Sequence, residues 1–227
     1  MQTTSINAQQ IALLETACQE LCLEPTEKQK EQLLEYITLL MKWNQTYNLT
    51  AIKDPNQALI QHVFDSLSVI PPIKKYISLK KIQEPEMLDV GSGAGLPGLV
   101  IALMIPEARV TCVDPVEKKM TFIRQVAGIF NLANIKTQHE RVENIKTGPF
   151  DIVTSRAFAS LEDFADLAGY QVKNDGVLVA MKGKKPQEEI EVLEKNTLWK
   201  VELIETLTVP QLDAHRCLVW MRKKGTV

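Results

Sequence analysis

A glycine-rich turn between a buried strand and a helix constrains this chain more than any other feature of its sequence. Residues 87–98 read MLDVGSGAGLPG, with Gly91, Gly93 and Gly95 separated by single residues. Glycines are needed where a backbone turns sharply and approaches a ligand without interference from a Cβ atom. Asp114 follows about 20 residues later, at the end of the next apolar run, where a carboxylate can accept hydrogen bonds from ribose hydroxyls. The pattern predicts a site for a nucleoside-containing cofactor.

From residue 87 onward, short apolar runs alternate with helical patterns. Strands are expected at 87–90, 109–113, 135–139, 150–154 and 177–181, and helices at 97–105, 116–131, 160–170 and 186–195. This alternation predicts an α/β domain with a mostly parallel sheet, covered on both faces, whose ligands lie beyond the carboxyl ends of the strands. Two last strand-like runs, 199–208 and 217–222, have no helix between them, so they predict a terminal antiparallel hairpin.

The residues before this pattern are expected to be helical. Helices are predicted at 7–22, 27–46 and 54–67. Pro71 and Pro72 are then expected to end the third helix. The length of 227 residues suits one large domain or a domain with an appendage. We therefore predict an N-terminal helical extension, residues 1–70, packed as one unit with a core domain of residues 71–227.

Composition excludes several classes of protein. Hydrophobic residues make up 45% and charged residues 24%, as in ordinary globular chains. The longest apolar stretch, residues 96–105, contains Pro97 and Gly98 and is shorter than the roughly 18 to 20 residues of a membrane span. The first ten residues contain no Lys or Arg and lead into no apolar segment, so no signal peptide is expected. We expect a cytoplasmic protein without a disulfide framework or a metal site.

The charges are unevenly distributed. The net charge of −2 argues by itself against a nucleic-acid partner, but the last twelve residues hold four cations and no acid. Other basic clusters occur at Lys74, Lys75, Lys80 and Lys81, at Lys118, Lys119 and Arg124, and at Lys182, Lys184 and Lys185. A single cluster of this kind is usually only a solvated face, so the charges permit an RNA partner without requiring one.

The turn also differs from a dinucleotide-binding loop. Its core is G-x-G-x-G preceded by Asp89, instead of G-x-G-x-x-G. The arrangement Asp-x-Gly-x-Gly-x-Gly resembles the first motif of class I S-adenosylmethionine-dependent methyltransferases, whose cofactor has no pyrophosphate. That family has a Rossmann-like fold and ends its sheet with an antiparallel strand, as the terminal hairpin suggests here.

Motifs that are missing narrow the chemistry. After the strand at 150–154, the sequence reads SRAFAS, without the Asn or Asp, two prolines and aromatic residue typical of enzymes that methylate exocyclic amines. Pyrimidine C5 methylation needs a nucleophilic cysteine, yet Cys112 and Cys217 lie in predicted strands. The remaining pattern favours a nucleophile that loses no proton, such as guanine N7, for which positioning can supply most of the catalysis.

Several motifs in order resemble the bacterial 16S ribosomal RNA guanine-N7 methyltransferase family, also called RsmG or glucose-inhibited division protein B. The resemblance covers roughly residues 40 to 220, and the order of the motifs is more specific than any one of them. The motifs are Trp43–Thr50, His62–Ser66, Leu96–Gly98, Arg141–Glu143, Ser155–Ser160, Lys182–Gly183 and Arg216.

The resemblance implies a cofactor site for S-adenosylmethionine. It implies that Asp114 holds the ribose, that Val142 and Glu143 flank the adenine, and that Arg156 lies near the methionine end. The turn lines the same site with Gly91, Gly93, Gly95 and Leu96.

The resemblance also implies a catalytic and RNA-binding rim made by Arg156, Lys182 and Arg216, with 16S ribosomal RNA, free or within the small subunit, as the substrate. Arg222 and the two lysines after it are expected to be outer phosphate contacts. His215 stands where the family often has an acidic residue, which leaves the local charge open. We expect a monomer.

Some alternatives stay open. His62 and Asp65 could form a hydrogen-bonded interface between the helical part and the sheet, or contact the substrate. A small-molecule methyltransferase would share the glycine turn but lack a basic rim. A non-catalytic ribosome-binding or assembly protein would have no reason to keep both the turn and Asp114.

Overall fold

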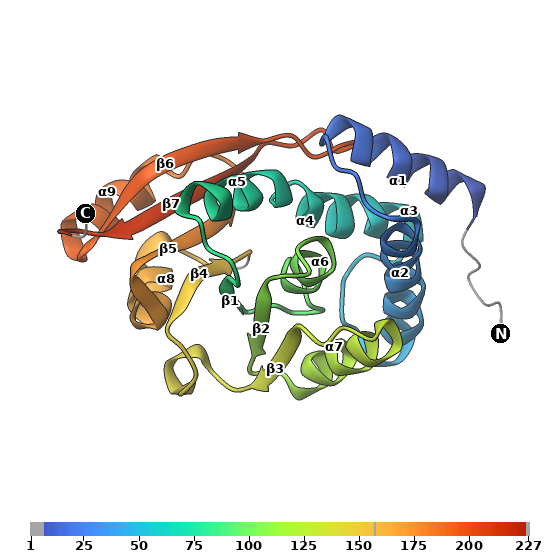
Figure 1. Ribbon diagram of the computed structural model, residues 1–227, viewed down its shortest axis with the longest axis horizontal. Helices are drawn as coiled ribbons and strands as arrows, with labels where there is room; N and C mark the ends of the chain where they lie inside the picture. The colour runs from blue at the N-terminus through green and yellow to red at the C-terminus, as the bar shows by residue number, and fades with distance from the viewer. Residues whose placement is uncertain (1–6, 157, 226–227) are drawn as a thin grey trace.

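The computed structural model describes residues 7–156 and 158–225 and contains one twisted sheet with helices on both faces (Figure 1). The strand order is β3-β2-β1-β4-β5-β7-β6. Strands β1 to β5 pair in parallel, whereas β7 is antiparallel to both β5 and β6. The bounds are β1 Glu86–Val90, β2 Arg109–Asp114, β3 Ile135–His139, β4 Phe150–Ser155, β5 Val172–Lys182, β6 Trp199–Leu207 and β7 Arg216–Lys223. The predicted parallel sheet and terminal hairpin are confirmed.

Helices precede the sheet and alternate with its strands. Their bounds are α1 Ala8–Glu20, α2 Glu27–Tyr47, α3 Pro55–Ala58, α4 Asp65–Leu67, α5 Ile70–Lys80, α6 Gly98–Met104, α7 Glu117–Phe130, α8 Leu161–Ala168 and α9 Gln187–Asn196. Short 3-10 turns cover Val142–Asn144 and Gly169–Gln171. Capping boxes begin the first two helices, with Asn7 and Gln10 at α1 and Thr26 and Gln29 at α2.

Two helical segments differ from the prediction. The expected helix over 54–67 begins at its Asp54 cap and Pro55, but its middle, Leu59–Phe64, is π-helical. The proline pair, expected to end a helix, instead lies in the first turn of α5. A proline is tolerated there because the first N–H groups of a helix have no intrahelical partner.

The sheet buries a different hydrophobic cluster on each face. Side chains alternate along a strand, so in β5 Val177, Val179 and Met181 join the cluster of α1 to α7, whereas Leu178 and Ala180 join that of α8 and α9. Figure 1 shows these two groups of helices on opposite sides of the strands. Both faces are therefore closed to ligands, which leaves the ends of the strands as the accessible positions.

The N-terminal helices share their core with the sheet. Residues of α1, α2 and the π-helical segment belong to the same buried cluster as residues of β1, β2 and β5. The predicted boundary between residues 70 and 71 falls in the first turn of α5. Division into an extension and a core stays a prediction. In the described ranges, no helix is long and apolar enough to cross a membrane.

Candidate functional site

The glycine turn leaves β1 at its carboxyl end and leads into α6. Gly91, Gly93 and Gly95 have positive φ angles of 67°, 57° and 92°. A Cβ atom added to Gly91 or Gly93 would meet no described heavy atom within 4 Å, whereas one on Gly95 would lie 3.1 Å from Ile123. The first two glycines therefore leave open space for a ligand, and the third allows α7 to pack against the turn.

Two carboxylates, those of Asp89 and Asp114, accept hydrogen bonds from backbone N–H groups of this turn and of the start of α6. Gly98 N–H donates to Oδ2 of Asp89 at 2.8 Å, and a Cβ atom on Gly98 would lie 2.6 Å from the sulfur of Cys112. Asp89 is only 1% exposed, and within the described residues its Oδ1 atom has no hydrogen-bond partner. Burial raises the pKa of Asp89 to about 7 and that of Cys112 well above its usual value.

Asp114, the second carboxylate, ends β2 and faces the same turn. Its Oδ2 atom accepts from Gly93 N–H at 3.1 Å and from Lys119 Nζ at 3.2 Å, and its Oδ1 atom accepts from Val116 N–H at 2.9 Å. Each carboxylate oxygen has two lone pairs, so one acceptor position remains on Oδ1 within these contacts. The role in holding a ribose stays a prediction.

A cleft of about 270 Å³ opens beside the turn, at the carboxyl ends of β1, β2 and β4. Its lining includes three predicted cofactor residues, Gly91, Val142 and Glu143. Apolar side chains such as Val113 and Phe158 form much of the remaining wall. The other predicted residues of the turn, Gly93, Gly95 and Leu96, do not line this cleft. They shape the loop behind it.

A second cavity, of about 370 Å³, lies at the carboxyl end of β5 and the start of β7. It brings together all three residues of the predicted basic rim, Arg156, Lys182 and Arg216, with His62 and Asp65. Ile52, Gln61, Met181 and Gly183 complete its lining. The two cavities share a wall, because Ser155 lines the first and Arg156, the next residue, lines the second.

Ion pairs organise the second cavity. The Asp65 carboxylate accepts from Arg216 Nε at 2.8 Å and lies 3.4 Å from Arg156 Nη1. Lys182 Nζ lies 2.7 Å from Glu189 of α9 and donates to the carbonyl oxygens of Phe158 and Ala159 in the shared wall. The lysine is thus tied to the loop after β4, while both arginine side chains remain about a quarter exposed.

His62 connects this cavity to the loop after α2. Its Nε2 atom lies 2.8 Å from Thr50 Oγ1, and Thr50 N–H donates to Asn44 Oδ1 at 2.9 Å. Burial, followed by the nearby positive charge of Arg156, lowers the pKa of His62 to about 4. The imidazole is therefore neutral at pH 7 and adds no cation to the cavity.

The basic tail does not belong to this edge. Arg222 is 6% exposed, donates from Nε to Glu202 at 2.9 Å and from Nη1 to the Asp175 carbonyl at 2.7 Å. Because β7 is antiparallel to β5, its last residues lie at the amino ends of the parallel strands. The prediction that Arg222 is an outer phosphate contact is therefore wrong, because its side chain is buried and paired with Glu202.

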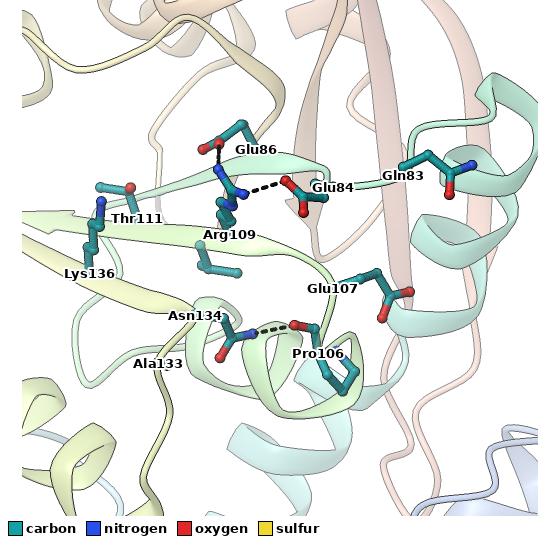
Figure 2. A pocket seen from close by; sticks show the side chains of 11 residues that line it. Gln83, Glu84, Glu86, Pro106, Glu107, Arg109, Thr111, Ala133, Asn134 and Lys136 are labelled. Carbon is teal, nitrogen blue, oxygen red and sulfur yellow. Dashed lines mark hydrogen bonds and ion pairs between the residues drawn. The ribbon is translucent and has the colours of Figure 1, made fainter.

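The opposite edge of the sheet also has a broad hollow (Figure 2). It lies at the amino ends of β1, β2 and β3, where Figure 2 shows Arg109 pointing toward Glu84 and Glu86. Its one described arginine is thus already paired with two acids. Ligands of open α/β sheets bind at the carboxyl ends, so this hollow is the weaker candidate.

Sequence reasoning missed one buried contact to the turn. Tyr36 of α2 is fully buried and donates its hydroxyl to the Ala94 carbonyl at 2.9 Å. Its position on the apolar face of α2 identifies a core residue. No local pattern in the sequence identifies its partner 58 residues away.

Strand order, a glycine turn after β1 and an acidic residue at the end of β2 together define a class I methyltransferase. Solved structures agree on the fold: the ribosomal protein L11 methylase of Lactobacillus delbrueckii subsp. bulgaricus has a TM-score of 0.56 at 15% identity, with 70% of this chain and 78% of that chain covered. A SAM dependent methyltransferase from Aquifex aeolicus has a TM-score of 0.51 at 16% identity, with 69% and 92% covered.

Sequence relatives define the family. The family model for rRNA small subunit methyltransferase G matches residues 29–219. The ribosomal RNA small subunit methyltransferase G of Bordetella avium is 54% identical over 215 residues, 94% of each chain, and that of Bordetella pertussis is 51% identical over 211 residues, 92% of each chain. The chain belongs to the rRNA small subunit methyltransferase G family, which confirms the resemblance inferred from its motifs.

Proposed function

We propose that this protein transfers a methyl group from S-adenosylmethionine to N7 of a guanine in 16S ribosomal RNA. The observation that carries the proposal is the pair of adjoining cavities at one edge of the sheet. One is largely apolar and lies beside the glycine turn, and the other holds Arg156, Lys182 and Arg216. Family membership supplies the class of substrate, and the two cavities supply separate places for cofactor and RNA.

The first cavity fits the cofactor. Gly91, Val142 and Glu143 line the cavity, and we assign the last two to the adenine. Gly93 and Asp114 lie beside this cavity, where the Cβ position of Gly93 is open and Asp114 retains an acceptor position that we assign to a ribose hydroxyl. S-adenosylmethionine supplies an electrophilic methyl group when it is bound there. The chain's contribution is orientation and exclusion of water by the apolar walls.

The second cavity fits a guanine nucleotide. The guanidinium groups of Arg156 and Arg216 can donate to a phosphate or to the acceptor atoms of the base. Guanine N7 has a lone pair and no proton, so no residue has to act as a general base. A neutral histidine could act as a base, but the Nε2 atom of His62 is already engaged with Thr50. This agrees with a reaction that requires positioning without proton transfer.

The test replaces the substrate atom. An RNA carrying 7-deazaguanine at the target position lacks the N7 lone pair but keeps the Watson–Crick edge and the ribose. We expect no methyl transfer to it, whereas the unmodified RNA is methylated and yields 7-methylguanosine after digestion. Transfer to the deaza RNA at an undiminished rate would place the methyl group elsewhere, even if the cofactor binds as proposed. A monomeric state stays a prediction that the same preparation can test by its mass in solution.

Two other functions make different predictions. A small-molecule methyltransferase has no need of three cations from three strand ends in one cavity. A non-catalytic ribosome-binding protein has no need of the cofactor cleft. Calorimetry should detect S-adenosylmethionine binding to either enzyme but not to a non-catalytic ribosome-binding protein. Small-subunit RNA from cells that lack this gene should be methylated by the proposed enzyme but not by a small-molecule methyltransferase.

A further inference from the structure

We propose that Asp65 is a positioning residue of the methyl-transfer reaction, which holds the guanidinium groups of Arg156 and Arg216 together facing the RNA. The inference rests on the proposed function, because it assigns the second cavity to the RNA. Asp65 itself would not touch the substrate. It would act through the two arginines.

Burial separates the carboxylate from the groups it holds. The Asp65 side chain is 5% exposed, whereas the side chains of Arg156 and Arg216 are 26% and 28% exposed. One carboxylate oxygen contacts each arginine, at 3.4 and 2.8 Å. Each guanidinium has five N–H donors, so both retain donors for a ligand after pairing with Asp65. The arginines can therefore reach the RNA while the carboxylate stays behind them.

The three residues come from distant parts of the chain. Asp65 begins α4 directly after the π-helical segment, Arg156 follows β4, and Arg216 begins β7. Single π-turns inside helices occur often at functional sites. Two guanidinium groups in one cavity repel each other, and a carboxylate between them adds two attractions that offset this repulsion. Without it, neither arginine has a described acidic partner in the cavity.

The arrangement also sets the charge that the RNA meets. Glu189 compensates Lys182, and His62 is neutral, so Asp65 leaves one net positive charge on the pair of arginines. That charge matches a single phosphodiester group. A fully uncompensated pair would bind any anion more strongly and hold it less specifically.

A purely structural role is the competing explanation, and other contacts already supply that role. Gln29, Gln32 and Tyr36 of α2 donate side-chain hydrogen bonds to backbone carbonyls of the core at 2.6, 3.1 and 2.9 Å. The same helices share one hydrophobic cluster with the sheet. The N-terminal helices therefore do not depend on Asp65 for their attachment.

A double-mutant cycle on kcat tests the proposal. Asp65→Asn should lower single-turnover methyl transfer about 10- to 100-fold, because small misplacements of substrate-orienting groups have effects of this size. Its affinity for S-adenosylmethionine should stay within about twofold, since the cofactor cleft does not include Asp65. In an Arg216→Ala background, the fold-loss of rate caused by Asp65→Asn should be at least about threefold smaller than in the wild type. The reason is that the effects of substitutions at residues that act through each other are not additive.

Asp151→Asn is the matched control. Asp151 is buried, pairs with Lys173 at 2.9 Å and accepts from Glu86 N–H at 2.8 Å, but lies at the amino end of β4. It should lose stability without loss of rate once folded. If Asp65→Asn does not fold, Asp65→Glu takes its place in the cycle, since it keeps the charge and moves the carboxylate by one methylene.

Three results would overturn the proposal: losses that multiply fully in the double variant, a loss of rate that only follows the folded fraction, or an unchanged rate. Each of these would leave the proposed function intact, provided that the wild-type enzyme methylates the unmodified RNA and spares the 7-deazaguanine RNA. Failure of that wild-type reaction would instead overturn the proposed function.

Discussion

At the scale of single residues, three buried aspartates hold the groups that line or support the proposed ligand cavities. Asp65 holds two arginines, Asp114 caps the residues around the glycine turn, and Asp89 supports the start of α6. The motifs in the sequence identify Arg156 and Arg216 separately. They cannot show that both pair with Asp65, because those partners lie 91 and 151 residues apart in the chain.

His62 yields a prediction about stability and pH. Its pKa is lowered from 6.5 to about 4 in the folded protein, so between these values the unfolded chain binds more protons. Its contribution to stability is fully present above pH 6.5 and is lost as the pH falls toward 4, by up to about 3 kcal/mol. The His62→Gln variant should therefore lose less unfolding free energy between pH 7 and pH 4.5 than the wild type does.

Urea unfolding of both proteins at several pH values provides the measurement. Asp89 acts in the opposite direction, because its pKa is raised from 3.8 to about 7, and its contribution falls as the pH rises. Both proteins carry Asp89, so its effect cancels in the difference between them. Parallel stability curves for wild type and variant would contradict the assignment to His62.

At the scale of elements, periodicity predicted nearly every strand and helix from residue 87 onward, because each is decided by local patterns. Helix α5, which precedes this region, and the first half of β5 were not predicted. The proline pair in the first turn of α5 is compatible with either an end or a beginning of a helix, and the first half of β5, Val172–Gly176, includes polar residues and a glycine. Tertiary packing decides such ambiguous segments. The same holds for the π-helical segment, which no hydrophobic period distinguishes from an α-helix.

Helix α2 contacts the glycine turn through the hydroxyl group of Tyr36. Tyr36→Phe leaves the buried Ala94 carbonyl without that donor, so the free energy of unfolding should fall by about 1 to 3 kcal/mol. Because Ala94 lies between Gly93 and Gly95, the affinity for S-adenosylmethionine should fall as well. Tyr76→Phe is the control, since its hydroxyl meets the Asp175 carbonyl at 3.5 Å, at the amino edge. Calorimetric affinities that are equal in the two variants would mean that α2 does not support the turn.

The turn itself can be tested with Gly93→Val. A branched side chain at φ 57° is strained by about 1 to 2 kcal/mol and points into space that we assign to the cofactor. We expect a folded protein whose binding of S-adenosylmethionine is lost in calorimetry. Gly225→Val carries the same kind of strain, at φ 82° and in open space, but lies far along the chain from the turn. It should bind like the wild type, and wild-type affinity in Gly93→Val would remove the cofactor from this turn.

At the scale of the whole molecule, the two edges of the sheet differ in how their charges are arranged. The carboxyl edge has both proposed ligand cavities, and there one carboxylate, Asp65, is shared by two arginines. At the amino edge two arginines have acids of their own: Arg109 pairs with Glu84 and Glu86, and Arg222 pairs with Glu202. Total charge could not predict this division, because a net charge of −2 averages over both edges. The sequence places cations along the chain, and only the topology assigns each to an edge.

Two lysine pairs test that division. Lys184 and Lys185 are exposed and directly follow Lys182 and Gly183, which line the cavity that we assign to the RNA, whereas Lys223 and Lys224 lie at the amino edge. Lys224 Nζ donates to carbonyl oxygens at the end of α9, so part of the tail is already engaged in the fold. Under the proposed function, the first pair lies beside the RNA and the second pair lies at the other edge of the sheet.

Each phosphate contact steepens the fall of log affinity with log salt by about 0.7 for single strands and 0.9 for duplexes. A Lys184→Ala, Lys185→Ala double variant should therefore reduce that slope by roughly 1.4 to 1.8 if both lysines contact phosphates. Lys223→Ala, Lys224→Ala removes the same charge from the other edge and should leave the slope unchanged. RNA binding measured by fluorescence anisotropy from low to physiological salt supplies both slopes. If the slope is smaller in the Lys223→Ala, Lys224→Ala variant and unchanged in the Lys184→Ala, Lys185→Ala variant, the RNA lies across the amino edge, away from the arginines of the proposed site.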